Sequence, residues 1–132
     1  MIRKKEGGIF LITKIQQAKF GDIFFAELSA DENIQGGTRP VVIVQNNIGN
    51  SHSPTVEILP MSSQISKAMY MPTHVIVPAD YENGLVKDSV VLAEQVTTIN
   101  KKRLKRKIGS LRHEYLVKIG RARNIQSPFP IS

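Results

Sequence analysis

The chain has 132 residues, of which 41% are hydrophobic, so it is long enough for one domain with a modest core. It contains no cysteine, which excludes disulfide bonds and thiolate metal sites and fits a cytoplasmic location. No apolar run approaches the roughly 18 residues of a membrane span, and we expect no signal peptide because acidic and glycine residues interrupt the basic N-terminus.

Short strands separated by turn residues fill most of the first hundred residues. Residues 1–18 have weak periodicity and are expected to form an N-terminal extension, and the polar segments 29–37 and 46–54 are expected to be loops. The apolar, β-branched segments predict strands at Gly21–Leu28, Val41–Gln45, Thr55–Met61, His74–Val77 and Ser89–Ala93. We expect the second of these to be buried on both faces, and Pro60 to mark an edge or a bulge. This spacing is typical of a small barrel or sandwich.

The periodicity changes after the last of these strands. Asn100 is a candidate N-cap for a helix that runs through 104–108, and a second helix is expected over residues 112–124. In the second helix Leu116, Ile119 and Ala122 recur at helical spacing and form an apolar stripe. Residues 126–132 contain two prolines and are expected to be a tail.

Positive charge is concentrated in the last quarter of the chain. The formal net charge is +7, yet residues 1–100 hold eight Lys/Arg against ten acids, whereas residues 101–132 hold ten Lys/Arg and one acid. The run Lys101–Lys107, KKRLKRK, suits contact with nucleic acid or with an acidic partner chain. A solvated helix face that maintains solubility explains it equally well, and both interpretations stay open.

One arginine stands at the start of a buried strand, in the segment QGGTRPVVIVQNNIGN from Gln35 to Asn50. Gly36 and Gly37 precede it and would let a ligand approach the backbone, while Pro40 fixes the next backbone angle. A guanidinium held beside bare backbone suits a phosphate. From these residues alone, a Gly-Gly turn with a solvated Arg39 is the simpler alternative.

The three histidines do not predict a metal site. His52 lies in a polar loop, where it could transfer a proton near neutral pH or simply be solvated. His74 begins a strand and is expected to be a hydrogen-bonded structural residue. Because no two histidines are spaced at i+2 or i+4, we expect no metal ligand set and no cofactor.

Five segments together resemble the MazF/PemK family of toxin endoribonucleases, in the family's order. They are GDIFFAEL, QGGTRPVVIVQNNIGN, SPTVEILPMSS, MPTHVIV and DSVVLAEQVTTINKKRL. The resemblance covers residues 19–125. It implies a mainly β fold, an SH3-like small β-barrel with C-terminal helices, and sequence-specific, metal-independent cleavage of single-stranded RNA by the adjacent 2′-hydroxyl. It also implies a cytoplasmic homodimer, an acidic antitoxin, and operator DNA bound through the antitoxin complex.

The resemblance also implies roles for particular residues. Arg39 matches the family's catalytic arginine and would stabilise the transition state, while Ser62 falls where the family has a catalytic threonine or serine. Many relatives carry a glutamate where this chain has Ile34. A neighbouring acid, Glu32 or Asp31, could replace it if the loop is shifted, and the alternative is that this chain uses no carboxylate there. Glu32 and the loop residue His52 are the candidates for acid or base. Residues expected to contact RNA are Gly36, Gly37, Thr38, Ser63, Gln64, Lys67 and Tyr70.

Two alternatives follow from these departures. Ile34 and Ser62 would also suit a non-catalytic barrel of this family that binds nucleic acid or an antitoxin. Gyrase poisoning, which a related toxin fold performs, is disfavoured by the Gly-Gly-Thr-Arg-Pro motif.

Among the aromatic residues, Phe25 is expected in the core, and Tyr70 and Tyr81 beside loops where they could stack on bases.

Overall fold

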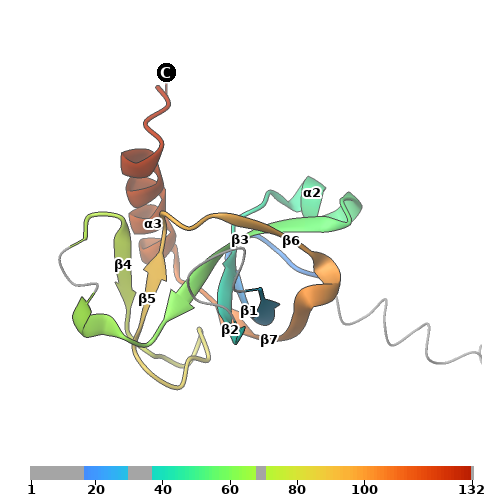
Figure 1. Cartoon of the computed structure of the whole chain (residues 1–132), viewed down its shortest axis with the longest axis horizontal. Helices are drawn as coiled ribbons and strands as arrows, with labels where there is room; N and C mark the ends of the chain where they lie inside the picture. The colour runs from blue at the N-terminus through green and yellow to red at the C-terminus, as the bar shows by residue number, and fades with distance from the viewer. Residues whose placement is uncertain (1–16, 30–36, 68–70, 132) are drawn as a thin grey trace, which may run out of the picture.

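The computed structural model describes residues 17–29, 37–67 and 71–131, which form an antiparallel sheet with a helix at its C-terminal end (Figure 1). The strands are β1 (Asp22–Leu28), β2 (Gly37–Ile43), β3 (Thr55–Ser62), β4 (His74–Val77), β5 (Ser89–Leu92), β6 (Thr97–Asn100) and β7 (Leu104–Ser110). The helices are α2 (Asn47–His52) and α3 (His113–Gln126), and the 3-10 turns are η1 (Ile65–Lys67) and η2 (Lys101–Arg103). Neighbours in the sheet run β4-β5-β3-β2-β1-β7, and β6 pairs with β3. The expected β-rich fold with a C-terminal helix is confirmed.

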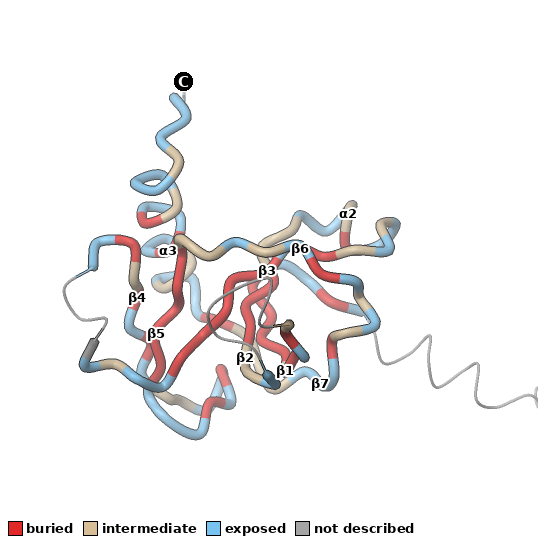
Figure 2. Tube along the Cα trace, viewed as in Figure 1, coloured by how far each residue is buried: buried red, intermediate tan, exposed pale blue. Residues whose placement is uncertain are grey.

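Strands β1, β2 and β3 each bury side chains on both faces over part of their length (Figure 2). Successive side chains of a strand point to opposite faces, so each of these strands supplies two apolar clusters. One cluster includes Ile23 and Val42 and packs under α3, and the other includes Phe24 and Val41. Of the second predicted strand, Val41–Ile43 is buried on both faces as expected. The observed strand runs from Gly37 to Ile43 rather than from 41 to 45, and its first four residues are exposed or half-buried.

Pro60 lies inside β3 at the point where that strand changes partner. On one side it faces Val41 of β2. On the other side, β6 pairs with residues 55–58 and β5 pairs with residues 61–62, so Pro60 falls between the two partners. A residue without an amide hydrogen suits this local edge, which agrees with the expectation for Pro60.

The second predicted helix is confirmed as α3. Ile119 and Ala122 are buried against the sheet, and Leu116 packs against the same cluster while partly exposed. The apolar stripe thus explains why this helix docks beside β4 and β5 (Figure 1). Residues 127–131 continue beyond the helix without regular structure.

The helix expected after Asn100 is wrong. Asn100 does act as a cap, since its side-chain oxygen accepts a hydrogen bond from the Lys102 amide at 2.9 Å. The turn that follows is the three-residue η2, and the chain then enters β7, which pairs with β1. Ser89–Ala93 is consequently not the last strand, because β6 and β7 come after it. The basic run lies on a turn and an edge strand instead of a helix face.

The loop expected over residues 46–54 is also wrong, because it contains the short helix α2. The Asn46 side chain accepts a hydrogen bond from the Gly49 amide at 2.8 Å and so caps the helix. Asn50 is buried and donates to the Gln45 carbonyl at 2.9 Å, which fixes the helix against the end of β2. Turn-forming residues here build a capped helical turn.

A close backbone approach brings the segment between β4 and β5 against β7. Gly84 has a φ of +68°, and a Cβ atom there would lie 1.9 Å from the Ile108 carbonyl oxygen. Only glycine tolerates both the conformation and the contact. This approach places residues 84–87 near the first half of β2, where they form one wall of a pocket.

Candidate functional site

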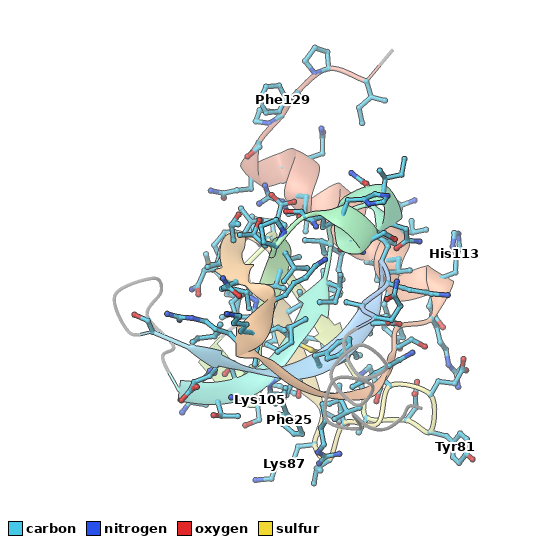
Figure 3. All side chains as sticks on the ribbon, turned by 90° about the vertical axis from the view of Figure 1, so that its right-hand side faces the viewer. Phe25, Tyr81, Lys87, Lys105, His113 and Phe129 are labelled. Carbon is cyan, nitrogen blue, oxygen red and sulfur yellow. The ribbon has the colours of Figure 1, made fainter. Side chains whose placement is uncertain are left out.

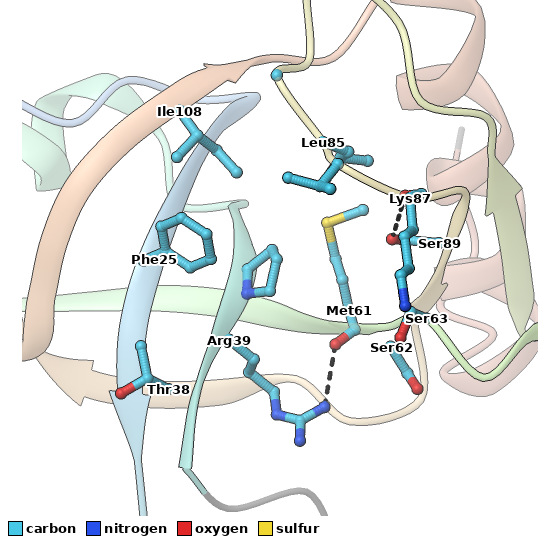
Figure 4. A pocket seen from close by; sticks show the side chains of 13 residues that line it. Phe25, Thr38, Arg39, Met61, Ser62, Ser63, Leu85, Lys87, Ser89 and Ile108 are labelled. Carbon is cyan, nitrogen blue, oxygen red and sulfur yellow. Dashed lines mark hydrogen bonds between the residues drawn. The ribbon is translucent and has the colours of Figure 1, made fainter.

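A pocket of about 370 Å³ opens where β2 and β3 meet the segment 84–87 and β7 (Figure 4). Its walls are largely apolar, and its charged and hydroxyl groups come from different strands and loops. The apolar lining consists of Phe25, Pro40, Met61, Leu85, Val86 and Ile108. The polar lining consists of Thr38, Arg39, Ser62, Ser63, Lys87 and Ser89. An apolar concave surface with a few converging polar groups is the usual form of a ligand site.

Arg39 lies in β2 opposite Ala26 of β1 and extends into this pocket. Its Nη1 donates a hydrogen bond to the Met61 carbonyl at 3.2 Å, which joins β2 to the end of β3. Burial lowers the pKa of the Arg39 guanidinium, because the charged form loses hydration. The group remains a cation at neutral pH, since an arginine pKa lies far above that range.

Ser62 ends β3 directly after the residue that Arg39 binds. The serine is 9% exposed, and its hydroxyl oxygen accepts a hydrogen bond from the Gln64 amide at 3.1 Å. Figure 4 shows the Ser62 side chain and the Arg39 guanidinium at the same mouth of the pocket. The sheet thus brings together a cation and a hydroxyl that are far apart in the sequence.

The backbone before Arg39 is open. Gly37 has a φ of +96°, and a Cβ placed there would meet nothing within 4 Å. Thr38 follows as an exposed residue on the pocket wall. A ligand can therefore approach the backbone at Gly37, as expected, whereas Gly36 lies outside the described residues.

Comparison with known proteins identifies the family. The sequence pattern of the family described as PemK-like, MazF-like toxin of type II toxin-antitoxin system matches residues 19–126. The chain belongs to this family. The expected resemblance is thereby confirmed.

Individual relatives of this MazF-like chain agree with that assignment. It is 45% identical over 108 residues to Endoribonuclease EndoA of Bacillus subtilis (strain 168), which covers 81% of this chain and 91% of the relative. It is 45% identical over 106 residues to Endoribonuclease MazF of Staphylococcus epidermidis, which covers 80% of this chain and 87% of the relative.

A solved structure matches the fold of this MazF-like chain. The structure is an endoribonuclease in complex with its cognate antitoxin from Mycobacterial species, and it superimposes with a TM-score of 0.71 at 22% identity. The match covers 87% of this chain and 99% of that chain. In the described part of this chain, no helix is long and apolar enough to cross a membrane.

The remaining predicted RNA contacts of this MazF-like chain are only partly described. Ser63 lines the pocket beside Ser62, and Gln64 follows as an exposed residue. Lys67 ends the turn η1. Gly36, Tyr70, Glu32 and Ile34 lie outside the described residues.

The histidines of this MazF-like chain lie away from the pocket lining. His52 ends α2 as an exposed residue. His74 Nε2 lies 3.0 Å from a carboxylate oxygen of Glu94, which confirms the expectation of a hydrogen-bonded structural histidine. Within the described ranges, no three His, Asp or Glu side chains gather as a metal-binding group would.

Sequence reasoning missed two parts of the site in this MazF-like chain. Lys87 lines the pocket as a second cation, and Figure 4 shows its side chain on the side where Ser62 and Ser63 lie. Phe25, expected in the core, is instead half-buried and forms part of the pocket wall. Tyr81, by contrast, is 99% exposed and does not line the pocket. No local motif marks Lys87, because a close approach between distant segments brings it here.

Proposed function

We propose that this chain is the toxin of a type II toxin–antitoxin system and cleaves single-stranded RNA in the cytoplasm without a metal ion. The observation that carries the proposal is the placement of Arg39 beside Ser62 in an open, partly apolar pocket. Two relatives at 45% identity are named endoribonucleases, which supports the same activity.

In the proposed reaction, the 2′-hydroxyl of one nucleotide attacks the adjacent phosphorus. The bond from phosphorus to the 5′-oxygen of the next nucleotide breaks, which leaves a 2′,3′-cyclic phosphate and a 5′-hydroxyl. Negative charge builds on the non-bridging phosphate oxygens in the transition state, and the Arg39 guanidinium can donate to two of them. Ser62 would orient the attacking hydroxyl or a phosphate oxygen through its own hydroxyl.

One proton must leave the 2′-hydroxyl and one must reach the departing 5′-oxygen. The described residues that line the pocket include no carboxylate and no imidazole. Arg39 is a poor base because its guanidinium stays protonated near neutral pH. We therefore propose Glu32, which lies outside the described residues, as the first candidate for proton transfer. His52 ends α2 and does not line the pocket, so it is the second candidate, and variants of each belong in the same assay.

Binding of RNA would use the residues around this pocket. We propose contacts from the backbone of Gly36 and Gly37 and from the side chains of Thr38, Ser63, Gln64, Lys67 and Tyr70. We further propose that the chain acts as a homodimer and is inhibited by an acidic antitoxin, whose complex binds operator DNA. The solved complex of a mycobacterial endoribonuclease with its cognate antitoxin supports such a partner.

The deciding experiment is cleavage of a sequence-diverse set of single-stranded RNAs in excess EDTA. We expect the natural protein to cut the RNA and leave products that end in a 2′,3′-cyclic phosphate, and Arg39→Ala to cut at least about 100-fold more slowly. Both proteins must unfold at similar temperatures, so that loss of activity is separated from loss of fold. Intact RNA across the whole set, despite salt-dependent binding, would favour the non-catalytic alternative.

A further inference from the structure

The basic run has separate structural roles along its length. Lys101 Nζ donates to the Asn50 carbonyl and so links η2 to α2. Lys107 forms an ion pair at 3.3 Å with Asp22, whose side chain is 7% exposed. These two lysines have partners within the fold. The other cations of β7 are Lys105 and Arg106.

A β-bulge lies between β1 and β7. Phe24 pairs with Lys107 and Ala26 pairs with Leu104, so the two residues Lys105 and Arg106 together oppose the single residue Phe25. A bulge of this kind bends the strand and redirects side chains. Here it gives two adjacent cations to the part of β7 that faces Phe25.

Arg106 contacts the outer wall of the pocket. Its guanidinium carbon lies 5.1 Å from the centroid of the Phe25 ring, within the range of a cation–π interaction. Phe25 in turn lines the pocket that contains Arg39. Arg106 is exposed, and no carboxylate of the described residues forms an ion pair with it.

The neighbouring cations lie on the same side of the molecule. Figure 3 shows Phe25, Lys87 and Lys105 together at one end of the molecule. Lys105 has an exposed contact with Glu27 at 3.7 Å, which is long and solvent-screened. Arg39 and Lys87 line the pocket, and Arg106 lies over the Phe25 ring of its wall, so cations are present both in the pocket and next to it.

We propose that Arg106 binds a backbone phosphate of the RNA strand next to the one cleaved in the pocket. This inference rests on the proposed function. A cation that is held by a ring face and lacks an acidic partner keeps its charge available to an anion. Contacts to phosphate position a strand without choosing its bases, so Arg106 would raise affinity for RNA without changing the cleavage sequence. We favour RNA over an acidic peptide because Phe25 connects Arg106 directly to the pocket.

The test measures binding of a labelled single-stranded RNA that carries 2′-O-methyl groups and therefore cannot undergo 2′-hydroxyl attack. Affinity is measured across a range of salt concentrations for the natural protein, Arg106→Ala, Arg106→Lys and the control Lys102→Ala. Lys102 is an exposed residue of η2 and has the same charge. One lost phosphate contact should reduce the slope of log affinity against log salt by about 0.7. Arg106→Lys and Lys102→Ala should keep the natural slope.

Three results would overturn the proposal. The first is an unchanged slope and affinity in Arg106→Ala. The second is an equal reduction in Lys102→Ala, which would mean a general effect of net charge. The third is unchanged RNA binding with weaker binding of a poly-glutamate probe, which would assign Arg106 to an acidic partner. Because the probe cannot be cut, each result is independent of whether the natural protein cleaves RNA.

Discussion

Arg39 donates a hydrogen bond from Nη1 to the carbonyl oxygen of Met61, the residue immediately before Ser62. The bond connects two neighbouring strands, so the position of the guanidinium depends on the end of β3. The bond thus fixes the proposed cation next to the residue that carries the proposed hydroxyl, and the Gln64 amide holds that hydroxyl. The effects of substituting either residue can be predicted from this arrangement.

Replacement of Arg39 by alanine and by lysine should separate the effect of its charge from the effect of its two-oxygen contact with phosphate. We expect Arg39→Ala to lower the rate of RNA cleavage by about 100- to 1,000-fold, as does removal of one donor to a developing oxyanion. Arg39→Lys should recover part of this rate, because an ammonium keeps the charge but cannot bind two phosphate oxygens in parallel. Single-turnover cleavage of one RNA by the three proteins measures the effect. Equal rates for Arg39→Lys and the natural protein would contradict the proposed two-oxygen contact.

Replacement of Ser62 should show what its hydroxyl contributes. Ser62→Ala removes the acceptor for the Gln64 amide as well as the proposed contact with RNA. We expect cleavage to fall roughly 10- to 100-fold, the range for a hydrogen bond to a charged group. Ser62→Thr keeps the hydroxyl and restricts its rotamers, so its rate should equal or exceed that of the natural protein. A slower Ser62→Thr than Ser62→Ala would show that space, not the hydroxyl, limits this position.

Lys87 should contribute to binding more than to the chemical step. It is exposed at the pocket wall, and no carboxylate of the described residues pairs with it. We expect Lys87→Ala to raise KM for RNA by about 10-fold with little change in kcat. A phosphate contact that is equally strong in the ground state and in the transition state contributes to substrate binding and not to the rate of the chemical step. The matched control is Lys118→Ala on α3, which does not line this pocket. A drop confined to kcat would instead place Lys87 at the reacting phosphate.

Substitution of Gly84 and of Gly120 by alanine should have opposite effects on the stability of the fold. At Gly84 a methyl group would overlap the Ile108 carbonyl, and the backbone has a positive φ, so we expect Gly84→Ala to destabilise the fold by about 2 kcal/mol or more. Gly120 lies in α3, where a Cβ would meet nothing within 4 Å. Gly120→Ala should therefore stabilise the fold by about 0.5–1 kcal/mol. Chemical denaturation of the two variants gives both values, and equal effects would contradict the close approach at Gly84.

Local sequence patterns predicted the strands and the helix in which buried apolar residues recur at regular spacing. The strands around β1 to β5 and the helix α3 were predicted because apolar residues recur with the period of each element. The segment after Asn100 was predicted wrongly although its cap was found. Lys, Arg and Leu favour helices, but pairing with β1 overrides this preference and the bulge removes the alternation typical of a strand.

Two residues of the candidate site were predicted from the sequence, and for different reasons. Arg39 was singled out by the Gly-Gly-Thr-Arg-Pro segment and Ser62 only by the resemblance to the MazF/PemK family, and the structure brings both to one pocket. Lys87 and Arg106 were not assigned to it, because their positions depend on the approach of Gly84 to β7 and on the bulge opposite Phe25. Such contacts between distant segments leave no periodic signal in the sequence.

The fit between Gly84 and the Ile108 carbonyl has a consequence for how substrate choice can diverge. Main chain resting on main chain fixes residues 84–87 against β7, and the exposed residues Val86 and Lys87 line the cleft beside that contact. Mutations at these two positions can therefore exchange the groups presented to a bound nucleotide while the opening keeps its dimensions, whereas Leu85 also belongs to the hydrophobic core. The architecture separates the frame of the cleft from its selectivity.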